Sequence, residues 1–236
     1  MKTNHIAIIM PAYNEAAVIG AVIAGLPRHY DDSNIDIIVV NDGSTDGTLN
    51  IARTNGAILI NHIVNSGGGG AGGATSTGLA YARNKNYDYA VTIDADGQHT
   101  PEDCLKVIAE LKKSNADMII GSRLINSVGM PWYRIIGNKG LSFFTYLMFG
   151  LYVTDSQSGL KGLNRKALET IEIRSQGMEF CSEMIWRAKQ QRLRVLEIPI
   201  QAVYTPYSLA KGQRNWNAIN IVRNLIKRKL LEFINA

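Results

Sequence analysis

Short runs of β-branched and other apolar residues alternate with helical patterns along the first half of the chain. This alternation limits the fold more than any other feature. The expected strands are residues 6–10, 35–40, 57–64, 89–94 and 116–121. Helical segments follow the first four of them, at residues 15–26, 48–55, 72–84 and 101–113. Strands that are apolar almost throughout and are joined by helices are typical of a sheet covered on both faces. The sequence therefore predicts an α/β fold with a mostly parallel sheet flanked by helices.

The second half of the chain is less regular from about residue 126, and one further strand is expected there, at residues 193–200. With 236 residues, 46% of them hydrophobic, the chain can bury one full core. No linker or repeat divides it, so we predict one domain over residues 1–206 and a basic amphipathic helical tail over residues 207–236. An apolar stripe in the tail would suit either a docked helix or membrane adhesion. Its members are Trp216, Ile219, Val222, Ile226, Leu230 and Phe233.

Cysteine content and hydropathy indicate where the protein works. Cys104 and Cys181 are far apart and lack histidines at metal-binding spacing, which predicts buried thiols in a reducing compartment. The longest uncharged apolar stretch, residues 141–153, is shorter than the roughly 20 residues that cross a bilayer, and the amino terminus carries no signal-peptide pattern. We therefore expect a cytoplasmic protein. The net charge of +5 would suit nucleic acid, but no nucleic-acid-binding motif accompanies it, so no such partner is expected.

Polar and glycine-rich segments follow each of the first five expected strands. They are residues 11–15, 41–48, 65–75, 94–99 and 121–123. The carboxyl ends of parallel strands meet at one edge of a sheet, and ligands of open α/β sheets bind in the crevice outside that edge. Glycine, asparagine and aspartate also form ordinary turns, so one such segment alone would carry little weight. Five segments at the same edge predict a ligand site.

Two carboxylates, Asp94 and Asp96, follow the apolar run of the fourth expected strand. In extended chain they would point the same way, and adjacent carboxylates repel each other unless a cation lies beside them. Oxygen ligands without a nearby cysteine favour a hard divalent ion, so we predict a Mg²⁺ or Mn²⁺ site formed by Asp94, Asp96 and Gln98. Gly97 allows the backbone to turn close to the ion. His99 is expected to be a solvated turn residue rather than a ligand.

Several motifs occur in the order and spacing of a known family. They are "PAYNE", "VVNDGSTDGT", "IDADGQHTPED", "GSR", "TDSQSGLKGLNRKAL" and "GMEFCSEMIWRAKQQRLRVLEIPI". From about residue 6 to residue 199 the chain resembles the family 2 glycosyltransferases of the GT-A fold, in particular the polyprenyl-phosphate, or dolichol-phosphate, sugar synthases. The resemblance implies a single GT-A domain with a Rossmann-like sheet. It also implies that a hexose is transferred with inversion from a UDP-sugar or GDP-sugar to polyprenyl phosphate. Membrane-spanning helices that end some members of the family are not expected here.

The same resemblance assigns roles to individual residues. The nucleotide-sugar donor would lie over the ends of the first two strands and beside the carboxylate pair. The donor-binding residues implied are Pro11, Ala12, Tyr13, Glu15, Asp42 and Asp94. Asp96 is implied as the first metal ligand, and the metal would stabilise the leaving diphosphate. Contacts with the acceptor phosphate are implied at Arg123, Arg134 and Asn138.

The acceptor decides which catalytic groups are needed. A lipid phosphate is already anionic at neutral pH and needs positive residues such as Arg123 to hold it. A saccharide hydroxyl must lose its proton, and Asp155 could be the base. We therefore predict catalytic roles for Asp96, Arg123 and Asp155, with Ser158 in the acceptor site, and keep transfer to a saccharide hydroxyl as the alternative. Residues 141–153 could form an interfacial helix that makes the protein peripheral at the cytoplasmic face of a membrane, or else a core helix.

A glycine-rich run opens a remote alternative from another class. Gly68, Gly70 and Gly73 satisfy the dinucleotide-binding pattern G-x-G-x-x-G before a helix, which would indicate an NAD-dependent oxidoreductase. That pattern normally occupies the first strand-to-helix turn, whereas this run follows the third strand. A second remote alternative is a nucleotide-sugar binding module without catalytic activity.

Overall fold

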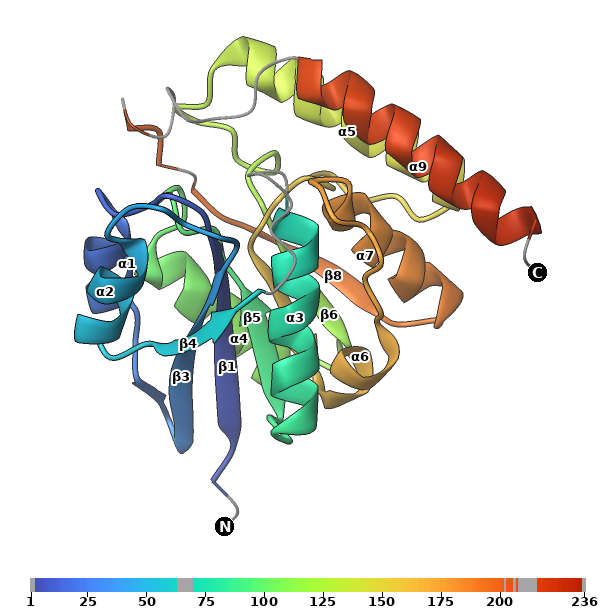
Figure 1. Cartoon of the computed structure of the whole chain (residues 1–236). Coiled ribbons are helices and arrows are strands. Elements are labelled where there is room, and N and C mark those ends of the chain that lie inside the picture. Colours follow the sequence, from blue (N-terminus) through green and yellow to red (C-terminus); the bar gives the residue numbers. More distant parts are fainter. Residues whose placement is uncertain (1–2, 63–69, 202, 206, 208–215, 235–236) are drawn as a thin grey trace.

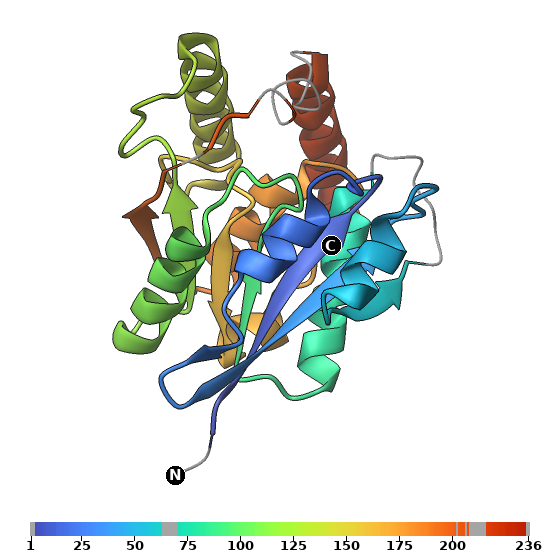
Figure 2. The same ribbon diagram turned by 90° about the vertical axis from the view of Figure 1, so that its left-hand side faces the viewer.

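A mixed sheet runs through the centre of the protein (Figure 1, Figure 2). The structure is a computed structural model that describes residues 3–62, 70–201, 203–205, 207 and 216–234. Within these residues the strand order is β2-β3-β1-β5-β7-β6-β8, and β4 also pairs with β3. The strands are β1 (His5–Ala12), β2 (His29–Tyr30), β3 (Ser33–Asn41), β4 (Ile58–Asn61), β5 (Tyr89–Thr92), β6 (Met118–Ser122), β7 (Lys161–Asn164) and β8 (Val195–Pro199). Only β2 and β7 run antiparallel to their neighbours in this part of the chain. The predicted α/β fold with a mostly parallel sheet is confirmed.

Helices cover both faces of the sheet because its strands bury alternate side chains on each side. On β1, Ile6, Ile8 and Met10 pack on one face, whereas Ala7 and Ile9 pack on the other. The first face is covered by α1 (Ile19–Gly25), α2 (Thr48–Thr54) and α4 (Pro101–Lys113). The second face is covered by α3 (Ala71–Asn84), α6 (Arg165–Thr170) and α7 (Phe180–Gln190). Burial on both faces explains why these strands read as continuous apolar runs.

Strand β7 decides where the functional loops lie, and the sequence analysis did not predict it. It pairs antiparallel with β5 and β6, so it begins at the edge where those two strands end. The loop before it, residues 154–160, therefore joins residues 94–99 and 121–123 at one edge of the sheet. Its lack of a long apolar run explains why it was missed.

Two expected strands are shorter in the structure. β5 ends at Thr92, so Asp94 and Asp96 lie in the following turn rather than in extended chain, which corrects the sequence-based expectation. The strand expected at residues 57–64 forms β4 and ends at Asn61. Residues 63 and 64 lie outside the described part of the chain.

Helices α5 (Trp132–Phe149) and α9 (Trp216–Ile234) lie side by side beyond the carboxyl edge of the sheet (Figure 1, Figure 2). A separate apolar cluster joins them to α7. Its buried members are Leu141, Phe149, Trp186, Ile221 and Leu225. No helix in the described residues is long and apolar enough to span a bilayer.

The apolar stripe expected in the tail is not the face on which α9 packs. Ile221 and Leu225, one turn apart, are buried against α5 and α7, and Val222 packs beside them. Ile226 and Leu230 are instead exposed. The side chains of Trp216, Ile219 and Phe233 lie outside the described part of the structure. The contact surface is therefore shifted around the helix from the predicted stripe, toward the positions that meet α5.

Two helical glycines provide a test of how tightly the sheet is packed. A Cβ at Gly78 in α3 would overlap the Ile9 side chain of β1, whereas a Cβ at Gly140 in α5 would meet no atom within 4 Å. We expect Gly78→Ala to lower the free energy of unfolding by about 1–3 kcal/mol through overpacking. Gly140→Ala should raise it by up to about 1 kcal/mol, because alanine favours the helix. Urea denaturation of both variants measures the difference, and equal effects would contradict the tight contact between α3 and β1.

Candidate active site

The loops that follow β1 and β3 are tied to each other at the carboxyl edge of the sheet. The side-chain Oδ1 of Asn14 accepts a hydrogen bond from the Thr45 N–H at 2.8 Å. Glu15 N–H in turn donates to Thr48 Oγ1 at 2.8 Å. Asn14 has a positive φ of 53°, a left-handed conformation that asparagine tolerates better than most residues. Pro11 and Ala12 end β1, and Tyr13 follows directly. The bonds from Asn14 and Glu15 therefore fix these predicted donor-binding residues beside the loop that follows β3.

Asp42 follows β3, and its carboxylate is buried. Its backbone N–H donates to Ala12 O at 2.9 Å, which aligns it with the end of β1. Its Oδ1 has no hydrogen-bond partner in the described structure, and Gly70 leaves the space that its Oδ2 occupies. A buried carboxylate oxygen without a donor is unfavourable, so this oxygen suits a ligand that brings an N–H or O–H group.

The turn after β5 contains the predicted metal ligands. Gly97 has a positive φ of 76°, which lets the chain turn so that Gln98 N–H donates to Asp96 Oδ1 at 3.0 Å. Burial and the neighbouring Asp94 carboxylate raise the pKa of Asp96 to about 6. The pKa of Asp94 moves the other way: burial opposes ionisation, but hydrogen bonding and charge from His99 lower it below its ordinary value. Two carboxylates with opposed shifts form a site that a cation would stabilise.

His99 differs from its predicted place in solvent. Its side chain is buried, with Nε2 lying 3.3 Å from Asp94 Oδ2. Its Nδ1 is also buried and has no partner in the described residues. The expectation of a solvated turn residue is therefore wrong. The chain turns back after Gly97, and the His99 imidazole packs against the Asp94 carboxylate.

A divalent cation fits this turn only with help from a ligand. No group of three or more His, Cys, Asp or Glu side chains gathers into a metal site in the described parts of the chain. Asp94 and Asp96 supply two carboxylates, and burial together with the Asp94 charge raises the pKa of Asp96, an effect that a bound cation would oppose. Mg²⁺ is commonly held by one or two carboxylates together with waters and substrate phosphates. The donor set therefore suits Mg²⁺ or Mn²⁺ bound together with a phosphorylated ligand.

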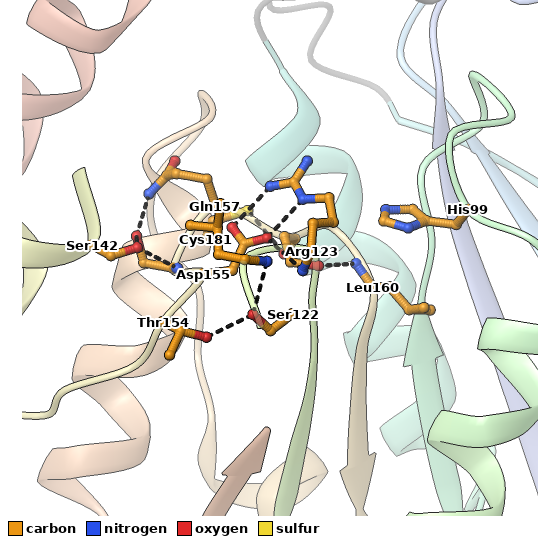
Figure 3. Close-up of polar contacts among 12 residues, drawn as sticks. His99, Ser122, Arg123, Ser142, Thr154, Asp155, Gln157, Leu160 and Cys181 are labelled. Atoms are coloured by element: carbon orange, nitrogen blue, oxygen red, sulfur yellow. Dashed lines mark hydrogen bonds and ion pairs between the residues drawn. The ribbon is translucent and has the colours of Figure 1, made fainter. Parts of the chain in front are cut away.

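Arg123 and Asp155 form a buried ion pair beside this turn (Figure 3). Asp155 Oδ2 accepts from Arg123 Nε at 2.7 Å, and Oδ1 accepts from Nη2 at 2.9 Å. Oδ2 also accepts from the Arg123 backbone N–H at 3.1 Å. Burial alone would raise the pKa of Asp155, but the charge and hydrogen bonds of Arg123 hold it below its ordinary value. Both carboxylate oxygens are engaged, while Arg123 Nη1 makes no hydrogen bond or ion pair within the described residues and can meet a ligand.

A polar network fixes the loop that carries Asp155. The Glu197 carboxylate on β8 accepts from the backbone N–H groups of Thr154 and Asp155. On the other side, Ser142 Oγ of α5 accepts from Ser156 N–H at 2.9 Å. The loop is thus held between the sheet and α5. Moving Asp155 away from Arg123 would break several of these hydrogen bonds.

Ser158 lies in the same loop and is fully buried. Its Oγ accepts from Leu160 N–H at 3.3 Å, and its carbonyl accepts from the buried ammonium of Lys161. In this arrangement Ser158 holds the turn into β7, and its predicted contact with an acceptor stays a prediction. Lys161 was not predicted as part of the site, because a lysine opening a strand gives no sequence signal of burial.

The first turns of α5 carry the other predicted acceptor residues. Arg134 and Asn138 are one helical turn apart and share a partly exposed face. The Arg134 guanidinium lies over the ring of Tyr204, 5.4 Å from its centroid. Tyr204 follows β8 and was missed, since a single tyrosine after a strand carries no motif.

The glycine-rich run does not form a dinucleotide site in the described residues. Gly72 and Gly73 N–H groups, at the start of α3, both donate to the Gln176 carbonyl, at 2.9 and 3.2 Å. A helix N-terminus binds phosphate through such amides, and here the protein itself occupies them. Gly68 lies outside the described part of the chain. The geometry thus opposes the NAD-dependent alternative.

Comparisons with known proteins agree with this geometry. Residues 7–172 match the family model described as glycosyl transferase family 2. The chain is 39% identical to a UDP-N-acetylglucosamine–dolichyl-phosphate N-acetylglucosaminyltransferase of Methanococcus voltae, over 98% of each chain. It is 28% identical to a polyprenol monophosphomannose synthase of Mycolicibacterium smegmatis, over 84% of this chain and 77% of that one.

A solved structure shares the fold. It is glucosyl-3-phosphoglycerate synthase from Mycobacterium tuberculosis in complex with Mn²⁺, UDP and glucosyl-3-phosphoglycerate, with a TM-score of 0.72 and 19% identity over 94% of this chain and 80% of that chain. This similarity confirms the GT-A fold. The family match and the relatives named as transferases or synthases favour a glycosyltransferase over an oxidoreductase or a non-catalytic binding module. The chain belongs to glycosyl transferase family 2, and it is a glycosyltransferase.

Proposed function

We propose that this protein is a metal-dependent inverting glycosyltransferase that moves a hexose from a UDP-sugar or GDP-sugar to polyprenyl or dolichyl phosphate. The observation that carries the proposal is the grouping of charges at the carboxyl edge of the sheet. The Asp94 carboxylate, beside Asp96, lies close enough to Arg123 to feel its charge, and Tyr204 lies near both Arg123 and Arg134. Two relatives support the acceptor class, one named for transfer to dolichyl phosphate and one for synthesis of polyprenol monophosphomannose. Their names differ in the sugar, so the donor is assigned only as a class.

The donor half would hold the nucleoside between the ends of β1 and β3. Asp42 Oδ1, buried and without a partner, would accept a hydrogen bond from the base. Glu15, whose carboxylate already accepts from Tyr207 Oη at 2.8 Å, would lie at the ribose. Pro11, Ala12 and Tyr13 would line the base. The UDP present in the structural relative's complex supports this class of donor.

Asp94, Asp96 and Gln98 would hold Mg²⁺ or Mn²⁺ together with the donor diphosphate. When bound, such an ion neutralises the charge that develops on the leaving diphosphate. Structural relatives crystallised with UDP and either Mn²⁺ or Mg²⁺ support this assignment. Asp94, Asp96 and Gln98 would thereby orient the diphosphate. His99, with Nε2 3.3 Å from Asp94 Oδ2, would fix the position of the Asp94 carboxylate.

The acceptor half would hold a phosphate through Arg123 Nη1 and Arg134, with the Asn138 amide on the same helix face. A phosphate oxygen would attack the anomeric carbon as the bond to the leaving diphosphate breaks on the opposite side, which inverts the configuration. A phosphate monoester is already an anionic nucleophile, so no base is needed. Asp155 would then act by holding Arg123.

The exposed face of α5 would meet the lipid. Trp132, Ile136, Phe143 and Leu147 recur at helical spacing and are between 56% and 72% exposed. Lys229 of α9 donates to the Met148 carbonyl of α5, and exposed basic residues of α9 such as Lys227 and Lys229 suit an anionic bilayer. We propose that this face docks peripherally at the cytoplasmic side of a membrane, where buried cysteines without a disulfide are compatible with a reducing compartment.

The proposed class of acceptor can be tested by measuring the release of nucleoside diphosphate from the donor. We expect release from one UDP-sugar or GDP-sugar to require polyprenyl phosphate and not polyprenol or a free saccharide, because the arginines bind the phosphate. A coupled assay across nucleotide sugars and these three acceptors measures it. Turnover with a saccharide alone would contradict the proposal.

The same assay tests the membrane surface when the acceptor is supplied either in detergent or in anionic vesicles. Leu147→Asp should keep its rate in detergent and lose most of it in vesicles. Ala80→Asp, at an exposed position of α3, is the matched control and should match the wild type in both. Equal vesicle rates for the two variants would place the lipid elsewhere.

Asp96→Ala should abolish turnover, because the diphosphate would lose its metal. It should also abolish the increase in melting temperature that Mn²⁺ and nucleoside diphosphate produce together in the wild type. Differential scanning fluorimetry measures that increase without relying on activity. Glu102→Ala, which removes an exposed acid from the first turn of α4, should retain it. An unchanged increase in Asp96→Ala would remove Asp96 from the metal site.

Asp155→Asn separates the two acceptor classes. If Asp155 holds Arg123, the variant should raise the KM for polyprenyl phosphate and retain measurable kcat. It should also lose roughly 3–5 kcal/mol of stability, because Arg123 is left buried without its partner. Loss of kcat with both KM values unchanged would instead identify Asp155 as the base for a hydroxyl acceptor. Steady-state kinetics and urea denaturation provide both readouts.

A further inference from the structure

Tyr204 lies in a short segment that links the two halves of the candidate site. The neighbouring Val203 N–H donates to the Gln98 carbonyl at 2.9 Å, which ties the segment to the turn with the proposed metal ligands. The Tyr204 ring itself lies beneath the Arg134 guanidinium, 5.4 Å from centroid to Cζ. The residue is therefore fixed between the donor side and α5, where the acceptor is proposed to enter.

The hydroxyl of Tyr204 has no hydrogen-bond partner within the part of the chain that the structure describes. Its Oη is buried, and no donor or acceptor in the described residues bonds to it. Buried tyrosine hydroxyls usually find a partner, because leaving one unpaired is unfavourable. The ring is held by Arg134, so the hydroxyl cannot turn to solvent without losing that contact. An unpaired group held in this way marks the place of a ligand.

The charges around Tyr204 indicate what kind of ligand would fit. Burial raises the pKa of Tyr204, and among nearby charges Arg123 and Arg134 lower it while Asp155 raises it. The net shift is upward, so the phenol keeps its proton at neutral pH and can donate it in a hydrogen bond to an anion. Arginine has donors and no acceptor. With Arg123 Nη1 and Arg134, Tyr204 Oη completes a set of donors that suits a group rich in acceptor oxygens.

We propose that Tyr204 binds the acceptor phosphate by donating a hydrogen bond from Oη to one of its oxygens, as a third ligand beside Arg123 and Arg134. The inference deepens the proposed function and rests on it, since it requires a phosphorylated acceptor. A saccharide hydroxyl offers one oxygen that must lose a proton, and a site made only of donors does not assist that loss. Tyr204 thus favours phosphate monoesters over free hydroxyl groups.

The test compares Tyr204→Phe with the wild type, using farnesyl phosphate as a short polyprenyl phosphate. Phenylalanine keeps the ring under Arg134 and removes only Oη. We expect the KM for farnesyl phosphate to rise about tenfold, as for loss of one hydrogen bond to a charged group, while the KM for the nucleotide sugar stays unchanged. Tyr204→Leu removes the ring as well and should raise the acceptor KM further. Tyr81→Phe, in α3, is the matched control and should behave as the wild type.

Binding of farnesyl phosphate, followed by calorimetry in the presence of nucleoside diphosphate, gives a readout that does not depend on turnover. A merely structural tyrosine would lower the melting temperature and weaken donor and acceptor together. If the wild type binds and uses farnesyl phosphate and Tyr204→Phe does so equally well, the role of Tyr204 is overturned and the proposed function stands. If the wild type neither binds nor uses it, the proposed function and the role of Tyr204 both fail.

Discussion

The buried ion pair between Arg123 and Asp155 is the interaction around which this edge of the sheet is organised. Taking two charges out of water is costly. The pair is maintained because each Asp155 oxygen accepts a guanidinium N–H, and because Glu197 and Ser142 accept hydrogen bonds from backbone N–H groups of the surrounding loop. The pair joins the end of β6 to the loop before β7. That loop reaches the edge only because β7 runs antiparallel to β5 and β6, which brings residues 154–160 next to residues 94–99 and 121–123.

Helix α5 is coupled to the same ion pair. Ser142 of α5 bonds the loop through Ser156, and Thr145 and Ser182 extend this buried polar contact to α7. The opposite face of α5 is apolar and exposed. If that face meets a bilayer as proposed, α5 would link the position of the bilayer to the position of Arg123. The core interpretation of residues 141–153 holds for the buried face, which includes Leu141, Phe149 and Val153. The interfacial interpretation stays a prediction.

The sequence predicted those parts of the protein whose signal is local. Apolar runs predicted the parallel strands, and the residues after them predicted which edge carries the loops. β7 was missed because four residues with a lysine and a glycine give no periodic signal, and its pairing is decided by β5 and β6. His99 was misplaced for a similar reason, since burial after Gly97 depends on how the turn folds under Asp94. Tyr204 depends on a contact with Arg134, 70 positions earlier, that no spacing rule could anticipate.

The state of Asp155 also bears on which acceptor chemistry this site favours. A general base must offer a free oxygen to the proton that it removes, and its pKa should lie near the working pH. Asp155 offers neither, because both oxygens are bonded and Arg123 holds its pKa below the ordinary value. Releasing it would separate a buried pair, at a cost of roughly 3–5 kcal/mol, or more than a hundredfold in rate. A phosphate acceptor avoids that cost, because it needs Arg123 in the place where Asp155 already holds it.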